Sequence, residues 1–168
     1  MDTVRHILEV KGQDVWSIAP TISVYDALRT MADKDVGSLL VMEGDQLVGM
    51  ISERDYARKI VLQGKTSRET LVSEIMSTRF PIVHPDQTVQ ECMSLMTEHH
   101  VRYLPVIEDH VILGVVSIGD VVGNIMHRQR QTIQQLEGRM KSETPTEPVR
   151  TGFSDHLEIG RASCRERV

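Results

Sequence analysis

The sequence has little of what marks several protein classes. Its two cysteines, Cys92 and Cys164, are too few for a disulfide framework or a cysteine metal cluster. Its longest apolar runs fall far short of the roughly 20 residues that span a bilayer, so no transmembrane helix is predicted. Positive charge is scarce too: 19 Lys and Arg stand against 24 Asp and Glu, and the formal net charge of -5 disfavours nucleic acid as a partner.

The first residues carry neither the apolar stretch of a secretory signal nor the Arg- and Ser-rich composition of a transit peptide. A cytoplasmic protein is therefore expected, although a processed protein of an organellar matrix would have the same sequence features. Aromatic residues make up only 4% of the chain, whereas there are nine methionines, so the core must consist mainly of aliphatic side chains.

The most informative feature that is present is an internal repeat. Residues 15–60 align with residues 80–125 at a constant offset of 65, without a gap, and 11 of the 46 positions are identical. Unrelated segments of ordinary composition would share roughly three. The chain therefore contains two copies of one unit.

Each copy has the pattern of a small α/β unit. Residues 23–36 and 88–101 have apolar residues at helical spacing, and each begins with Ser or Thr followed three residues later by Asp or Glu, which is typical of a capping box. Residues 38–52 and 103–117 then predict two strands joined by a turn. A short extended segment in front and a second helix behind give the order strand, helix, strand, strand, helix.

Two matched motifs carry a resemblance to a known family. The segments GMISERD (49–55) and GVVSIGD (114–120) resemble the signature of the cystathionine-β-synthase-like (CBS) domain. The sequence Leu104-Pro105-Val106 is similar to that family's central strand, from which the first copy departs with Leu40. The resemblance covers residues 3 to about 128 and is of the small stand-alone bacterial and organellar type. It implies an α/β (α+β) fold in which two tandem CBS units, a Bateman module, pack about a pseudo-twofold axis.

The internal repeat and the extent of the resemblance suggest domain boundaries. We expect the first unit with its lead in residues 3–64, the second in 65–128, and a helical extension in 129–140. Pro, Thr and charged residues predict that 141–157 is disordered. Residues 158–168, EIGRASCRERV, match the translation of a common sequencing-adapter read-through and are left out of functional reasoning.

The resemblance implies an adenosine-binding cleft beside each motif. A strand that ends at Ser and a helix that begins near Asp bring free N–H groups, which suit phosphate, close to a carboxylate, which suits ribose hydroxyls. The predicted ligand-binding residues belong to these turns, to the mouths of the middle strands and to apolar walls. They are Ser52, Arg54, Asp55, Ser117, Ile118, Gly119 and Asp120 in the turns, Gly37, Ser38, Arg102 and Tyr103 at the strand mouths, and Val15, Ile18, Ile82 and Val83 in the walls.

Other interpretations of these residues stay open. Ser-x-x-Asp before a helix is also the ordinary N-cap pattern, and capping does not exclude ligand binding. Arg54 and Arg58 lie four residues apart and could reach a phosphate or simply be solvated. His99 and His100 point in different directions and favour a polar helix end over a metal site, while the position of Cys92 on an apolar helix face indicates a core residue.

The expected function is a non-catalytic regulatory module for energy sensing. It would bind AMP, ADP or ATP, or else NAD(H) or S-adenosylmethionine, without a metal, and would pass the ligand state to a regulated protein. Homodimers are expected because Ile125, Ile133, Leu136 and Met140 would leave an apolar stripe uncovered on a monomer. The alternatives are a ligand-free dimerisation scaffold and a small nucleotide hydrolase, for which the sequence offers no activated nucleophile or metal cage.

Overall fold

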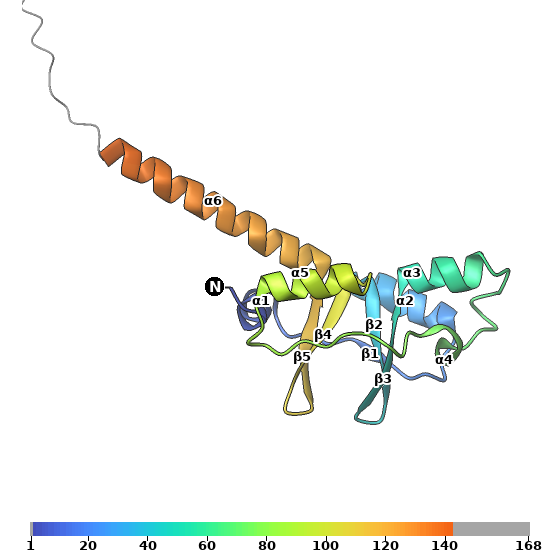
Figure 1. Ribbon diagram of the computed structural model, residues 1–168. Helices are drawn as coiled ribbons and strands as arrows, with labels where there is room; N and C mark the ends of the chain where they lie inside the picture. Colours follow the sequence, from blue (N-terminus) through green and yellow to red (C-terminus); the bar gives the residue numbers. More distant parts are fainter. Residues whose placement is uncertain (1, 143–168) are drawn as a thin grey trace, which may run out of the picture. The chain divides into compact units, whose positions relative to one another are not determined.

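The computed structural model describes residues 2–142. The described residues up to 131 form one compact unit, and residues 132–142, the end of the last helix, belong to another. Both repeats lie in the first unit, where Figure 1 shows two strand hairpins with helices beside them. None of the helices in this described part of the chain is both long and apolar enough to cross a membrane.

The first repeat is a three-stranded sheet with its helices. Strand β1 (Ser17–Ile18) runs parallel to β2 (Ser38–Glu43), and β2 pairs antiparallel with β3 (Gln46–Ser52). Helix α2 (Val24–Lys34) begins where the Ser23 hydroxyl accepts the backbone N–H of Asp26, which confirms the predicted cap. After β3, α3 (Glu53–Tyr56) continues as the π-helical turn η1 (Ala57–Val61) instead of the regular helix that the sequence predicts.

The second repeat keeps the predicted order except for its first strand. It consists of α5 (Val89–Glu98), β4 (Tyr103–Glu108), β5 (Val111–Ser117) and the start of α6 (Ile118–Ser142). In place of a first strand, Val83 makes a single isolated bridge to Val106. Prolines at positions 81 and 85 flank this segment, and a proline has no N–H to donate to a ladder.

The two leads are exchanged between the repeats. Helix α1 (Val4–Lys11) packs into the core of the second repeat, where Val4 is buried, whereas the short helix α4 (Val72–Ile75) packs into the core of the first, where Val72 is buried. Backbone hydrogen bonds follow the same exchange: the N–H of Val4 donates to Gln87 and the N–H of Val72 donates to Ile22, both at 2.9 Å. Each repeat is therefore completed by a segment that precedes the other one in the sequence.

The expected boundaries meet this arrangement in different ways. Ranges 3–64 and 65–128 divide the sequence at the repeat, but the exchanged leads cross that division. The extension expected over 129–140 is the continuation of α6, which runs through Lys141 to Ser142, so the first two residues of the range expected to be disordered are helical. The remainder of 141–157 and all of 158–168 lie outside the described residues.

The predicted apolar stripe on α6 is shorter than expected. Ile125 is partly buried because it packs against the core of the second repeat. Ile133, Leu136 and Met140 are each more than half exposed. The stripe therefore belongs to the later turns of the helix, and Ile125 contributes to the core.

Candidate functional site

The two Ser-x-x-Asp turns have the same geometry. At the end of β3, one carboxylate oxygen of Asp55 accepts both the backbone N–H and the hydroxyl of Ser52, each at 2.9 Å. At the end of β5, one carboxylate oxygen of Asp120 accepts the same two groups of Ser117, each at 2.8 Å. The capping interpretation is thus confirmed in both copies, and each carboxylate is held in a fixed orientation. The second oxygen of Asp55 accepts the Ser77 hydroxyl at 3.4 Å and pairs with Lys59, whereas Oδ1 of Asp120 accepts no hydrogen bond within residues 2–142.

Each turn borders a cavity between the repeats. The first cleft has a volume of about 430 Å³ and the second about 440 Å³. Both lie in the range of 300–1,000 Å³ that is usual for small-molecule sites. The first cleft is lined by Gly37, Ser38, Met50, Ile51, Ser52, Glu53, Arg54, Asp55, Arg58, Lys59, Ser77, Arg79, Phe80, His99, His100, Val101, Arg102 and Tyr103. The second cleft is lined by Lys11, Gly12, Asp14, Trp16, Lys34, Asp35, Val36, Gly37, Ser38, Tyr103, Val115, Ser117 and Asp120.

Tyr103 and Gly37 lie where the two clefts meet. Both residues line both cavities, as does the buried Ser38. A Cβ atom on Gly37 would overlap the Tyr103 hydroxyl, so the glycine allows this close approach between the repeats. Burial raises the pKa of Tyr103, with a further contribution from the charge of Glu53, so the phenol stays neutral and can donate a hydrogen bond.

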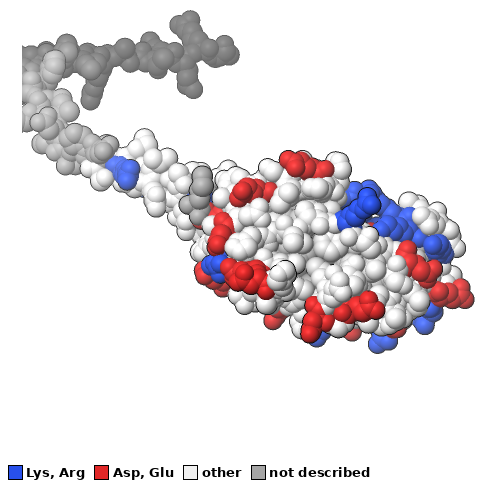
Figure 2. Space-filling model, turned by 60° about the horizontal axis from the view of Figure 1, so that its bottom comes forward, with Lys and Arg blue, Asp and Glu red and all other residues white. Residues whose placement is uncertain are grey.

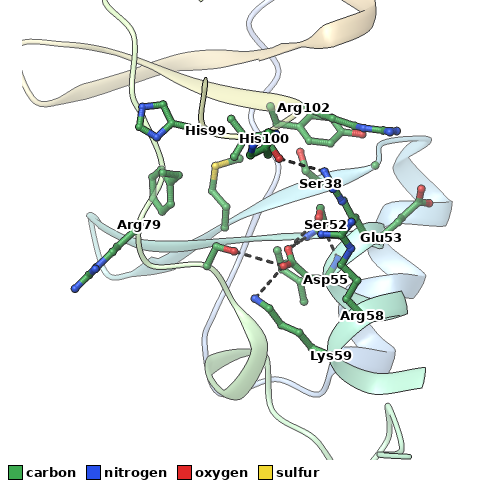
Figure 3. A pocket seen from close by; sticks show the side chains of 18 residues that line it. Ser38, Ser52, Glu53, Asp55, Arg58, Lys59, Arg79, His99, His100 and Arg102 are labelled. Atoms are coloured by element: carbon green, nitrogen blue, oxygen red, sulfur yellow. Dashed lines mark hydrogen bonds and ion pairs between the residues drawn. The ribbon is translucent and has the colours of Figure 1, made fainter. Parts of the chain in front are cut away.

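The first cleft is strongly basic. Five cationic side chains line it against two carboxylates, and Figure 3 shows the ammonium of Lys59 directed toward Asp55. Lys59 donates to the backbone oxygen of Ile75 at 2.7 Å and pairs with Asp55 at 3.0 Å, and Arg54 donates to the backbone oxygen of His100 at 3.1 Å. Figure 2 shows basic side chains concentrated on one part of the visible face, apart from most of the acidic groups.

The second cleft is different in charge and in how its cations are held. Two lysines line it against three carboxylates. The Lys11 ammonium donates to the backbone oxygen of Val115 at 2.9 Å and to the carboxylate of Asp120, and Lys34 lies over the Trp16 ring at 4.1 Å. Burial alone would raise the pKa of Asp120, but hydrogen bonds from Lys11 and Ser117 outweigh it and lower the pKa below the ordinary value.

Most of the predicted ligand residues lie in these cavities. Ser52, Arg54, Asp55 and Arg102 line the first cleft, Ser117 and Asp120 line the second, and Gly37, Ser38 and Tyr103 line both. The histidine pair ends α5 as predicted, and it also borders the first cleft.

Six predicted residues do not line either cavity. Ile118 borders a smaller groove beside Met96 instead, and Gly119 follows it in the first turn of α6. Ile18 packs against the first core and Val83 lies inside the second, because apolar side chains at paired strand positions turn toward the core. Val15 is half-buried and Ile82 is exposed. The aromatic neighbours Trp16 and Phe80 form the apolar walls in their place.

Sequence reasoning missed several residues that the packing brings in. Lys59 and Arg79 in the first cleft, and Lys11, Asp14 and Lys34 in the second, were not singled out. Lys59 follows Asp55 by one helical turn, so its position could have been inferred from the motif. Lys11, Asp14 and Arg79 lie in leads or connections, where spacing carries no signal, and Lys34 is the exposed last residue of α2, which the helical pattern does not direct toward a cleft.

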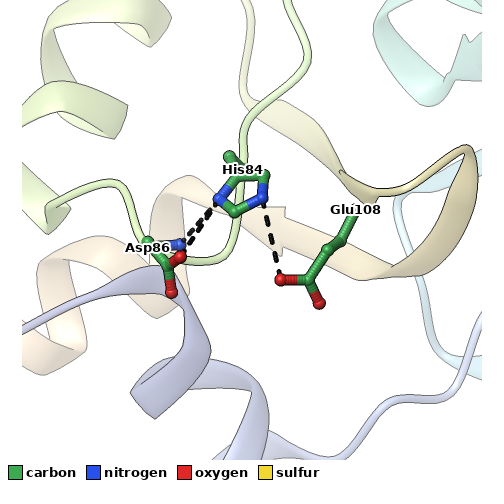
Figure 4. Close-up of side chains that lie close together, drawn as sticks. All are labelled: His84, Asp86 and Glu108. Atoms are coloured by element: carbon green, nitrogen blue, oxygen red, sulfur yellow. Dashed lines mark hydrogen bonds and ion pairs between the residues drawn. The ribbon is translucent and has the colours of Figure 1, made fainter.

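A cluster of metal-ligand types lies outside the clefts. The ligand atoms of His84, Asp86 and Glu108 are within 4.8 Å of one another (Figure 4). Arg5 already donates to both carboxylates, at 3.0 and 2.9 Å, and the two ring nitrogens of His84 face different carboxylates. Arg5 therefore already neutralises these carboxylates and would compete with a cation for them.

Cys92, the cysteine within the described residues, is not activated as a nucleophile. Cys92 is buried in the second core, as predicted, and burial raises the pKa of its thiol to about 11. At neutral pH it is therefore protonated and enclosed by apolar side chains.

The sequence matches the model of the CBS domain family twice, over residues 4–62 and 72–127. CBS domain-containing protein CBSX3, mitochondrial, of Arabidopsis thaliana is 40% identical over 143 residues, which cover 80% of this chain and 69% of that protein. A solved structure of a protein with CBS domains from Burkholderia ambifaria is 44% identical with a TM-score of 0.73, covering 76% of this chain and 96% of that one.

Two further solved structures of this fold contain ligands. The CBS domain pair of MJ0100, 23% identical with a TM-score of 0.66, was solved with 5′-methylthioadenosine and S-adenosyl-L-methionine, over 76% of this chain and 98% of that one. Hypoxic Response Protein I, 27% identical with a TM-score of 0.61, was solved with two coordinated zinc ions, over 74% and 99%.

Proposed function

This chain belongs to the CBS domain family, and from that premise we propose that it is a regulatory module that binds an adenine nucleotide, AMP or ATP, between its two repeats. It works as a homodimer, without catalysis, and passes its ligand state to a protein that it regulates. We place it in the cytoplasm or an organellar matrix, since the Arabidopsis relative is named as mitochondrial.

The observation that carries the proposal is the pair of Ser-x-x-Asp turns, each on the edge of a nucleotide-sized cavity. Both carboxylates are fixed by their own turns. Oδ1 of Asp120 remains able to accept a ribose hydroxyl, whereas at Asp55 a ribose hydroxyl would replace the 3.4 Å hydrogen bond from Ser77. Aromatic walls, Phe80 in the first cleft and Trp16 in the second, offer surfaces on which a base can stack. The structure of MJ0100 supports the ligand class, because that domain pair of the same fold was solved in complex with two adenosine derivatives.

The position of the clefts gives a mechanism. The first cleft is formed by residues 52–59 of the first repeat and residues 99–103 of the second, so a bound ligand contacts both. A ligand that binds one arrangement of the repeats better than another shifts the population toward it, by no more than its difference in affinity. A partner that contacts both repeats can then detect the ligand.

Calorimetric titration of the full chain with AMP, ADP, ATP and NADH tests this function. We expect binding to weaken about tenfold in Asp55→Asn or Asp120→Asn, because each loses a charged acceptor. Glu91→Gln is the matched control: Glu91 closes the same kind of capping box at the start of α5, outside both clefts, so it should lower stability but not affinity. Light scattering on the same samples should give twice the chain mass of 19.0 kDa.

Two results would contradict the proposal. Absence of heat with all four nucleotides at millimolar concentration would leave the dimerisation scaffold as the better description. Release of phosphate from ATP and magnesium that Asp55→Asn or Asp120→Asn abolishes would instead identify a hydrolase.

A further inference from the structure

The two clefts occupy equivalent places in the two repeats, but their charges are not equivalent. With the offset of 65, Arg54, Arg58, Lys59 and Arg79 of the first cleft correspond to Gly119, Gly123, Asn124 and Asp14. Every one of these four cations is replaced by a neutral or acidic residue. The turns and the cavities are therefore the same in both repeats, whereas these four cations belong to the first cleft alone.

Much of the positive charge in the first cleft is uncompensated. The side chains of Arg58, Arg79 and Arg102 have no hydrogen-bond or ion-pair partner within residues 2–142. Arg79 points away from the centre of the cavity in Figure 3, and because it is exposed, its side chain can change rotamer on the nanosecond timescale. Three guanidinium groups around one cavity repel each other, and a multivalent anion with paired oxygens relieves that repulsion.

The size of the surplus indicates how many phosphates it suits. Five cations against two carboxylates leave three uncompensated positive charges in the first cleft. A single phosphate monoester carries about two negative charges at pH 7. A di- or triphosphate therefore balances the first cleft better than a monophosphate does.

The second cleft offers the opposite environment. Lys11 is already engaged by Asp120 and by the Val115 carbonyl. Lys34 lies over Trp16, and Asp14 and Asp35 add negative charge to the wall. A polyphosphate there would face the carboxylates of Asp14 and Asp35, and no arginine is among the residues that line this cleft.

We propose that the clefts are specialised by charge: the first binds the polyphosphate of one nucleoside di- or triphosphate per chain, through Arg58 and Arg79, and the second excludes polyphosphate. This inference rests on the proposed nucleotide-binding function and adds to it the class of ligand and the stoichiometry. Arg54 and Arg102 border the same cavity and add further positive charge.

Calorimetry with adenosine, AMP, ADP, ATP and inorganic tripolyphosphate on the full chain tests it. Affinity should rise with the number of phosphates, with one ATP per chain. The variant Arg58→Gln/Arg79→Gln should weaken ATP about 100-fold, roughly tenfold for each lost contact, and leave adenosine unchanged. Arg29→Gln, an exposed arginine on α2 that lines neither cleft, is the matched control and should change nothing.

A reciprocal variant transfers the charge to the second cleft. There is room for it, since a Cβ on Gly123 meets no atom within 4 Å and one on Gly119 meets only Ser117 Oγ at 3.6 Å. Gly119→Arg/Gly123→Arg should bind a second ATP. Trp16 is the single tryptophan and lines the second cleft, so its fluorescence should be quenched by ATP in this variant and not in the parent chain.

The outcomes separate this inference from the function on which it rests. Two ATP molecules per parent chain, or equal affinity for adenosine and ATP with no effect of the double glutamine variant, would overturn the charge specialisation but keep nucleotide binding. Binding of tripolyphosphate that the double variant abolishes, with no advantage for ATP, would keep the charge specialisation and overturn adenine recognition. Absence of binding by every probe would overturn both.

Discussion

The two repeats use matching residues in their cores and different residues around their clefts. Val24 and Val89, Met31 and Met96, and Leu39 and Leu104 are buried at equivalent positions. Around the clefts, by contrast, the repeat alignment pairs Arg58 with Gly123, and it pairs Arg79 with Asp14. The comparison shows that interior packing, which tolerates little change in volume, is preserved after duplication, whereas exposed positions are free to acquire separate roles.

The largest expected effect tests the claim that the cores are equivalent. Leu39→Ala and Leu104→Ala each remove a buried side chain from the same place in its own repeat, so each should lower the free energy of unfolding by about 3 kcal/mol. Urea denaturation, followed by circular dichroism, measures both. Because the leads are exchanged, both variants should unfold in one transition. A loss below about 1 kcal/mol for only one of the two variants would show that the two cores contribute unequally to the free energy of unfolding.

A medium effect is expected where the repeats meet. Gly37→Ala places a methyl group against the Tyr103 hydroxyl, and this overlap should cost about 1–3 kcal/mol. Adding Tyr103→Phe removes the hydroxyl and leaves the ring carbon at 3.2 Å from the new methyl, so most of the loss should be recovered. Thermal unfolding of the two single variants and the double variant measures the coupling. Additive losses would mean that the contact between the repeats is relaxed some other way.

The sequence predicts the core and the two motif turns well, and it predicts the other residues around the clefts less well. The helical spacing of residues 23–36 and 88–101 predicts that Met31, Met93 and Met96 face the core. Met31 and Met96 are buried, whereas Met93 is 37% exposed, so that prediction is wrong for Met93. Asp55 and Asp120 were identified because their turns recur at one spacing, and both line clefts. Periodicity and repetition report local structure, and local structure dominates at these positions.

The residues that could not be predicted depend on how distant segments pack. Lys11 reaches the second cleft only because α1 crosses to the other repeat, and no pattern in residues 4–11 reveals this exchange. Arg79 reaches the first cleft because the irregular segment before it is held by the bridge between Met50 and Ser77. The absence of a first strand in the second repeat, among the described residues, could by contrast have been foreseen from the two prolines that flank this segment.

The smallest expected effects concern the ion pair between a lysine and the motif aspartate in each cleft. Lys11→Met removes the ion pair with Asp120, and Lys59→Met removes the corresponding pair with Asp55. Both lysines are more than a third exposed, so each loss at pH 7 should be only about 0.5 kcal/mol. The effect is therefore better measured through the titration of Asp120 than through stability alone.

The sign of that titration follows from the lowered pKa of Asp120. A carboxylate whose pKa is lower in the folded than in the unfolded chain adds stability above its unfolded value, about 3.9, and this stability is lost as the pH falls through the folded value. Lys11→Met should move the folded pKa upward and so reduce the acid-dependent part of the stability. NMR titration of the Asp120 carboxyl carbon measures the shift directly. An unchanged titration midpoint would show that the hydrogen bonds from Ser117 alone lower the pKa of Asp120. The ion pair with Lys11 would then contribute nothing to that pKa.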